Sequence, residues 1–165
     1  SFSPPMQNCA FEKLGLNYIY MPVEVAPENL ETVFKGLAKM NVGGFNVTIQ
    51  HKIHIMEFLD DLDPLAATIG AVNTICIHDG KSKGYNTDGE GFMRSLEEET
   101  GLSCKGKSFF LLGSGDAARA ISMTLAYKGA EKIYISNRTV QKAEALVSEI
   151  NHKIRDCAEM IPHQK

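Results

Sequence analysis

The chain has 165 residues, of which 44% are hydrophobic and 22% are charged. These proportions are typical of a globular protein and exclude collagen-like, coiled-coil and disordered chains. Its 17 basic and 20 acidic side chains give a net charge of -3. Without a basic stripe, this charge argues against a surface for nucleic acid or an anionic membrane, so we expect small molecules as partners.

Cysteines and histidines give no sign of a metal site or a disulfide framework. The four cysteines lie far apart and form no C-x-x-C pair. His51 and His54 share a helix face, but no third ligand is spaced to join them, so we expect no metal.

No apolar run approaches the roughly 18 residues that span a bilayer, which favours a cytoplasmic location. Because Ser1 falls inside a candidate motif, we expect the natural N-terminus to precede it.

Proline, glycine and apolar spacing divide the first half into alternating helices and strands. Ser3 before Pro4 and Pro5 predicts an N-cap, and Asp63 before Pro64 predicts another. The expected elements are helices over 4–14, from 27, from 52 and from 64, with strands over 18–23, 45–48, 71–77 and 82–85. The strand over 18–23 contains a proline, which favours an edge position. Asp79-Gly80 predicts a hairpin turn, so the sheet is expected to be mixed.

The second half begins after a helix that is entered at Thr87 or Asp88. The polar stretch 100–107 is the best candidate for a linker. A strand over 108–112, a glycine turn, a helix and a strand over 132–136 form a βαβ unit. The tail 151–165 has no apolar period and is expected to be frayed. We therefore predict an α/β protein with a mixed-sheet domain at 1–99, a linker at 100–107 and part of a Rossmann-like domain at 108–165.

The glycine turn of the βαβ unit is a candidate phosphate site. Gly113 allows a tight turn, Gly115 lets a pyrophosphate approach the backbone, and the following helix offers free N–H groups. The turn and first helical residues are Gly113, Ser114, Gly115, Asp116 and Ala117. Asp116 suits the helix dipole, yet its carboxylate would repel a pyrophosphate.

The end of the second strand of this unit predicts the choice of cofactor. NAD sites usually carry a carboxylate there, about 20 residues beyond the glycines. This chain instead has Asn137, Arg138 and Thr139, with Lys142 one turn later. A guanidinium with hydroxyl and amide neighbours matches a 2′-phosphate, so the pattern favours NADP. The alternative is that Arg138 is a solvated residue at a helix start.

Polar residues gather at predicted strand ends in the first half. They are Asn46, Thr48, Lys52, Asn73 and Asp88. Ligands of such sheets lie beyond the carboxyl ends of strands, so these side chains are expected to converge. Lys52 and Asp88 could then form a proton-transfer pair, which hydride exchange between an alcohol and a ketone requires. Taken singly, each residue also fits a cap, a turn or a solvated surface position.

A family resemblance rests on five segments: SFSP at 1–4, NVTIQHK at 46–52, IGAVNT at 69–74, GYNTDG at 84–89 and SNRT at 136–139. In order and spacing they resemble the signature segments of the shikimate dehydrogenase family. The resemblance implies NADP-dependent reduction of 3-dehydroshikimate to shikimate, a step of aromatic amino acid biosynthesis. It also implies that the chain is part of a longer domain pair.

The resemblance assigns a role to each candidate residue. Lys52 and Asp88 fall on the catalytic pair, and Ser1 and Ser3 fall on the serines that hold the substrate carboxylate. The positions that contact the ring hydroxyls are Asn46, Thr48, Asn73 and Asp88, and those of the cofactor segments are Gly113, Gly115, Asn137, Arg138 and Thr139. Gln50 stands where the family usually has proline, and Asp116 stands where it usually has a third glycine.

Two other functions stay open. One is a quinate and shikimate dehydrogenase with relaxed cofactor use, against which the Arg138 segment argues. The other is a truncated, non-catalytic chain that binds shikimate-like carboxylates or serves as an incomplete subunit. A homodimer is also left open.

Overall fold

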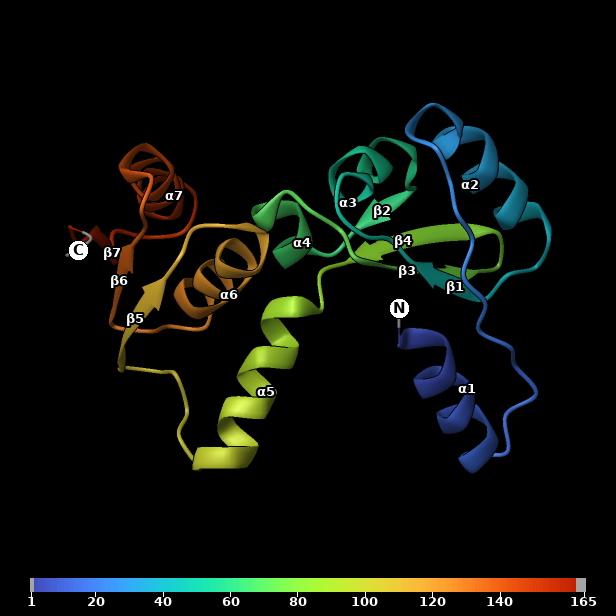
Figure 1. Cartoon of the computed structure of the whole chain (residues 1–165), viewed down its shortest axis with the longest axis horizontal. Helices are drawn as coiled ribbons and strands as arrows, with labels where there is room; N and C mark the ends of the chain where they lie inside the picture. Colours follow the sequence, from blue (N-terminus) through green and yellow to red (C-terminus); the bar gives the residue numbers. More distant parts are fainter. Residues whose placement is uncertain (1, 163–165) are drawn as a thin grey trace.

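Two separate sheets organise the chain, which a computed structural model describes from residue 2 to residue 162. The helices are α1 (Ser3–Lys13), η1 (Pro27–Asn29), α2 (Leu30–Lys39), α3 (His51–His54), η2 (Ile55–Phe58), α4 (Pro64–Ile69), α5 (Asp88–Thr100), α6 (Asp116–Tyr127) and α7 (Val140–Lys153). The strands are β1 (Gly44–Asn46), β2 (Asp61–Leu62), β3 (Thr74–His78), β4 (Lys81–Tyr85), β5 (Ser108–Leu112), β6 (Lys132–Ser136) and β7 (Ala158–Met160). The sheets have the orders β1-β3-β4-β2 and β5-β6-β7, and α4 to α6 lie between them (Figure 1).

The first sheet is mixed, as the sequence predicts. β3 pairs antiparallel with β1 and β4, and the short strand β2, which the sequence did not reveal, pairs parallel with β4. The predicted hairpin turn is confirmed, because Asp79 and Gly80 both have positive φ, at 50° and 73°. The predicted cap of α4 is also confirmed, since the Asp63 carboxylate accepts from the Leu65 and Ala66 amides at 3.0 and 3.3 Å.

The second sheet is parallel throughout and continues beyond the predicted βαβ unit. The expectation of a frayed tail is wrong as far as residue 162, because β7 pairs with β6 and Cys157 is buried. A side chain on α7 fixes this strand: the Asn151 carboxamide accepts from the Cys157 and Ala158 amides and donates to the Ala158 carbonyl, at 2.8 to 3.0 Å. Apolar periodicity misses such a strand because these bonds involve backbone groups.

A layer of helices joins the two sheets. Leu65 and Ile69 of α4 and Met93 of α5 belong to the same apolar cluster as Met123 of α6. A side-chain carbon at Gly89 would lie 2.0 Å from the Thr124 hydroxyl, so α5 crosses α6 closely only because residue 89 is glycine. The stretch 101–107 contributes the buried Cys104 to this cluster. The first sheet has its own core around Ile55, Val72 and Ile75.

The N-terminal segment differs most from the sequence predictions. Ser3 is the first residue of α1 and does not cap it. A cap at this position would serve Pro5, which has no N–H, and the Met6 amide already bonds to the Phe2 carbonyl. The predicted strand over 18–23 is absent. The Tyr20 amide and carbonyl instead bond to the Asn8 side chain, at 2.7 and 2.9 Å.

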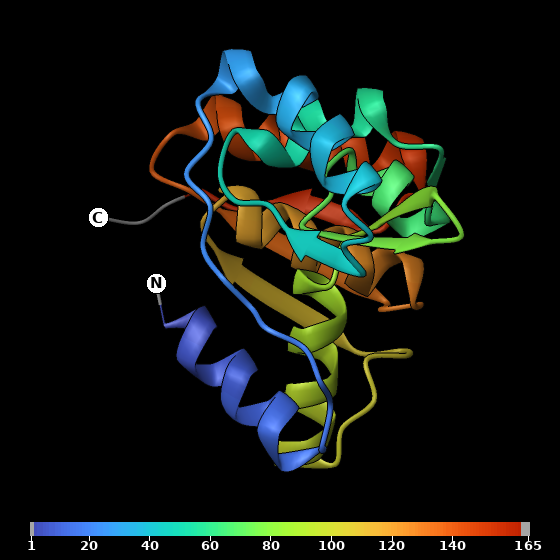
Figure 2. The same cartoon turned by 90° about the vertical axis from the view of Figure 1, so that its right-hand side faces the viewer.

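Both α1 and α5 extend toward the same side of the molecule, the lower side in both views (Figure 1, Figure 2). No residue of α1 is buried. Within residues 2–162, no helix is long and apolar enough to cross a membrane.

Candidate active site

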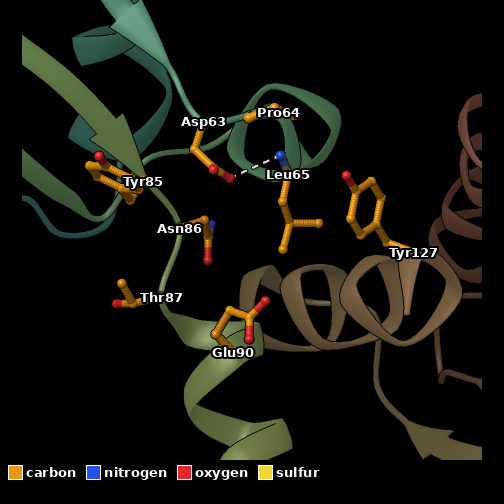
Figure 3. Close-up of a pocket in the computed structure, with 8 residues that line it drawn as sticks. All are labelled: Asp63, Pro64, Leu65, Tyr85, Asn86, Thr87, Glu90 and Tyr127. Carbon is orange, nitrogen blue, oxygen red and sulfur yellow. Dashed lines mark hydrogen bonds between the residues drawn. The ribbon is translucent and has the colours of Figure 1, made fainter. Parts of the chain in front are cut away.

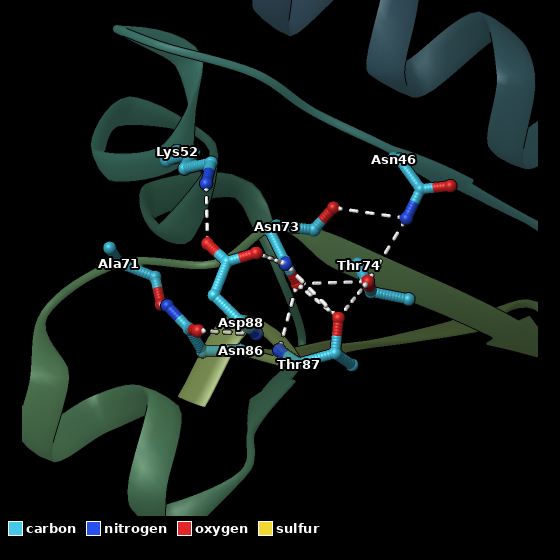
Figure 4. Close-up of polar contacts among 8 residues, drawn as sticks. All are labelled: Asn46, Lys52, Ala71, Asn73, Thr74, Asn86, Thr87 and Asp88. Carbon is cyan, nitrogen blue, oxygen red and sulfur yellow. Dashed lines mark hydrogen bonds and ion pairs between the residues drawn. The ribbon is translucent and has the colours of Figure 1, made fainter. Parts of the chain in front are cut away.

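Lys52 and Asp88, 36 residues apart in sequence, meet beside the first sheet. Lys52 lies in the first turn of α3, and Asp88 is the first residue of α5. The Lys52 Nζ lies 2.6 Å from Asp88 Oδ2, with the two side chains 19% and 36% exposed (Figure 4). Asp88 and Lys52 thus form an ion pair that solvent can still reach. A carboxylate and an ammonium so placed can hold and pass a proton.

Asn73 holds the second oxygen of the same carboxylate. Its side-chain amide donates to Asp88 Oδ1 at 2.7 Å, and only 9% of the residue is exposed. The Thr87 backbone amide donates to Asn73 Oδ1 at 3.0 Å, so the oxygen of this carboxamide must face Thr87 and its nitrogen must face Asp88 (Figure 4). Each Asp88 oxygen therefore has its own donor, which fixes the carboxylate plane for Lys52.

Asn46 extends this network toward the N-terminal segment. Its amide donates to the Asn73 carbonyl at 3.2 Å and to the Thr74 hydroxyl at 3.0 Å. Its oxygen accepts from the Tyr20 hydroxyl at 3.1 Å, and Asn8 holds the backbone of Tyr20. Sequence reasoning missed Tyr20 and Asn8, because their link to the site depends on an irregular segment that no periodicity predicts.

A strained turn separates Asn46 from Lys52. Thr48 is exposed in this turn, and Ile49 has a φ of 48°. A β-branched residue in this left-handed region is an outlier that costs about 1–2 kcal/mol. Gln50, the position of the expected proline, precedes α3 and is exposed. Strain of this kind recurs at functional sites.

Two more predicted residues belong to the N-terminal segment. Ser3 is half-buried in the first turn of α1, and Ser1 lies outside the described residues. His51, expected on the surface, is half-buried, and its Nε2 lies 2.9 Å from the Val25 carbonyl. In residues 2–162 no three His, Cys, Asp or Glu side chains gather to hold a metal ion.

A pocket of about 270 Å³ opens on the other side of the 85–87 segment (Figure 3). It contains neither Lys52 nor Asp88, and its carboxylates already have partners. Asp63 caps α4, and Glu90 pairs with Lys128 at 2.9 Å. For this reason the Lys52–Asp88 pair is the better candidate for chemistry.

The glycine turn between β5 and α6 has the features of a phosphate site. Gly113 has a φ of 119°, which favours glycine, and a side-chain carbon at Gly115 would meet no atom within 4 Å. The Ser114 hydroxyl is buried and has no hydrogen-bond partner among residues 2–162. A buried hydroxyl without a partner is costly, so a ligand oxygen here would complete its bonding. Asp116 and Ala117 are exposed in the first turn of α6.

The segment after β6 lies beside this turn. The Gly113 amide donates to the Ser136 carbonyl at 2.8 Å, which joins the two segments. Arg138, Thr139 and Lys142 are exposed, and the Asn137 side chain donates to the Thr139 carbonyl at 3.0 Å. Two exposed cationic side chains, Arg138 and Lys142, can therefore meet an anion next to the glycine turn.

Together these features define a class of two-part α/β proteins. A mixed-sheet unit with a Lys–Asp pair is followed by a Rossmann-like parallel unit with a glycine turn after its first strand. Known proteins of this class match the chain closely. The family model for the shikimate dehydrogenase substrate binding domain matches residues 1–75, and the model for shikimate / quinate 5-dehydrogenase matches residues 95–163.

Individual relatives point to the same family as the two family models. A shikimate dehydrogenase (NADP(+)) of Desulforamulus reducens is 49% identical over 98% of this chain and 56% of its own length. A crystal structure of a shikimate dehydrogenase in complex with NADP+ has 49% identity and a TM-score of 0.88, over 97% of this chain and 57% of that one. A structure of shikimate 5-dehydrogenase from Listeria monocytogenes with shikimate and NAD has 42% identity and a TM-score of 0.91, over 98% and 57%.

The chain belongs to the shikimate dehydrogenase family. It spans about half the length of the curated relatives it matches.

Proposed function

We propose that this chain takes part in the NADP-dependent interconversion of 3-dehydroshikimate and shikimate. The observation that carries the proposal is the 2.6 Å contact between Lys52 and Asp88, with Asn73 on the second carboxylate oxygen. The names of the relatives, and the NADP+ and shikimate in two similar structures, support this reaction. We further propose a cytoplasmic location, which suits a pathway of small polar metabolites.

In this mechanism the Lys52 ammonium donates a proton to the substrate oxygen as the ketone becomes an alcohol. Bound NADPH supplies the hydride. Asp88 stays within reach of Lys52 Nζ, stabilises its charge and helps it regain a proton. In the reverse direction the same pair takes the proton from the hydroxyl of shikimate.

For the substrate we propose that Ser1 and Ser3 hold the carboxylate and that Asn46, Thr48 and Asn73 lie along the ring hydroxyls. Both N–H groups of Asn46 and of Asn73 already donate within the protein. They therefore fix the shape of the site, while the exposed Thr48 hydroxyl is accessible to a ligand.

For the cofactor we propose that residues 113–117 hold the pyrophosphate and that residues 137–139 with Lys142 hold the 2′-phosphate. The open space at Gly115, the buried Ser114 hydroxyl and the exposed Arg138 fit such a ligand. The matching domain division is 1–99 for substrate, 100–107 for the connection and 108–165 for cofactor.

The test combines binding with turnover. Calorimetry measures shikimate binding, and NADPH formation from shikimate and NADP+ measures turnover. Lys52→Ala should lower kcat by about 10²- to 10⁴-fold with a much smaller change in KM. Lys83→Ala is the matched control, because Lys83 pairs with a different carboxylate, that of Asp61, on the surface. A Lys52→Ala variant that keeps more than about a third of wild-type kcat would remove Lys52 from the mechanism.

A second candidate is a chain that binds shikimate without turning it over. Binding without NADPH formation would support it. Equal turnover with NAD and NADP, or with quinate and shikimate, would instead support the broader quinate and shikimate dehydrogenase.

A further inference from the structure

Arg119 on α6 connects three helices through one guanidinium. Its Nε donates to the Ile69 carbonyl at the end of α4, at 2.8 Å. Its two terminal nitrogens donate to both carboxylate oxygens of Glu149 on α7, with Nη2 2.6 Å from Oε1. The pair is largely shielded, with the Arg119 and Glu149 side chains 28% and 25% exposed. A bidentate pair of this geometry fixes direction as well as charge.

The carbonyl that Arg119 holds begins the segment behind the Lys52–Asp88 pair. Three residues beyond Ile69, the Val72 amide donates to the Lys52 carbonyl at 2.8 Å. One residue further, Asn73 donates to Asp88. In the same segment, the Ala71 carbonyl accepts a hydrogen bond from the Asn86 side-chain amide at 3.0 Å. The Asn86 side-chain oxygen in turn accepts from the Asp88 backbone amide at 3.2 Å (Figure 4). Residues 69–73 therefore contact the backbone or side chain of both members of the pair.

At its other end Arg119 belongs to the helix that starts at the glycine turn. The Arg119 backbone amide donates to the Gly115 carbonyl at 2.8 Å, so the backbone of Arg119 lies one helical turn from the candidate phosphate site. A helix moves as a rigid body over one turn, because its backbone bonds are satisfied internally. A displacement of the turn toward a ligand would therefore be transmitted to Ile69.

We infer that Arg119 is a positioning residue that couples occupation of the glycine turn to the geometry of the Lys52–Asp88 pair, so that NADP and shikimate each strengthen the binding of the other. The inference rests on the proposed function. It concerns the relation between the two sites and not their chemistry. Lysine could not replace Arg119. The planar guanidinium donates from three nitrogens to the Ile69 carbonyl and to both Glu149 oxygens, whereas lysine has a single ammonium nitrogen.

The test measures the dissociation constant of shikimate with and without saturating NADP+, by calorimetry, for the wild type, Arg119→Lys and the control Arg94→Lys. Arg94 pairs with Glu98 on the exposed face of α5. In the wild type and the control, NADP+ should tighten shikimate binding at least about fivefold, the lower end of common couplings. In Arg119→Lys this ratio should fall toward one, while each ligand bound alone changes less than about threefold.

The outcomes separate the two proposals. A wild type that binds neither ligand refutes the proposed function and this inference with it. A wild type that binds both without coupling, or an Arg119→Lys variant with the wild-type ratio, overturns the inference and leaves the proposed function standing. If Arg119→Lys does not fold, Glu149→Gln, which keeps the size of the side chain, is measured in the same way. A ligand-free readout is the Asn73 side-chain amide resonance, which should shift in Arg119→Lys and not in Arg94→Lys.

Discussion

Replacing Glu149 by glutamine removes one charge from the Arg119–Glu149 pair and keeps its volume. Hydrogen bonds from Arg119, aided by Lys153, lower the pKa of the Glu149 carboxyl from 4.5 to about 2. Taken in full, that difference corresponds to about 3 kcal/mol of folding free energy. Water still reaches a quarter of each side chain and screens the pair, so we expect Glu149→Gln to lose about 1–2 kcal/mol at pH 7.

The loss should depend on pH in a defined direction. Because the pKa of Glu149 is lower in the folded than in the unfolded chain, its stabilisation is complete above about pH 4.5 and disappears as the pH falls toward 2. Urea unfolding of wild type and variant at pH 7 and pH 3.5 should show the gap between them shrinking by roughly half. The control is Glu98→Gln, whose partner Arg94 is 82% exposed, so that solvent screens the pair and the substitution should change stability much less than Glu149→Gln does. A gap that stays constant with pH would refute the assignment of this stability to the ionised carboxylate.

Three further outcomes are expected. Arg138→Ala should weaken NADP+ binding by about ten- to a hundredfold in a fluorescence titration and leave NAD+ nearly unchanged; equal losses would give Arg138 a role in the fold. Ser114→Ala should weaken NADP+ binding several-fold without lowering the unfolding midpoint, since its buried hydroxyl has no hydrogen-bond partner in the part of the chain that the structure describes; a lower midpoint would argue for a structural role. Gly89→Ala should destabilise the chain by about 1–3 kcal/mol in thermal unfolding, because the added carbon meets Thr124; an unchanged midpoint would mean that α5 shifts freely against α6.

The sequence by itself determined the parts of the fold that local chemistry controls. The α4 cap at Asp63, the Asp79-Gly80 turn and the βαβ unit around Gly113 depend on neighbouring residues, and all three form as predicted. The sequence also showed that polar residues, among them Lys52 and Asp88, stand at or near the predicted strand ends. The five family segments are equally visible in the chain, because each is a short run of residues.

Only the tertiary structure decided how distant parts meet. It brought Lys52 within 2.6 Å of Asp88 and placed Asn73 on the second oxygen. It replaced the expected strand at 18–23 by an irregular segment bound to Asn8, and it made a strand, β7, from a tail without apolar period. It joined Arg119 to both Ile69 and Glu149. The physical reason is the same in each case: these are hydrogen bonds and ion pairs between groups far apart along the chain, whose geometry depends on how whole helices and strands pack and not on the residues next to them.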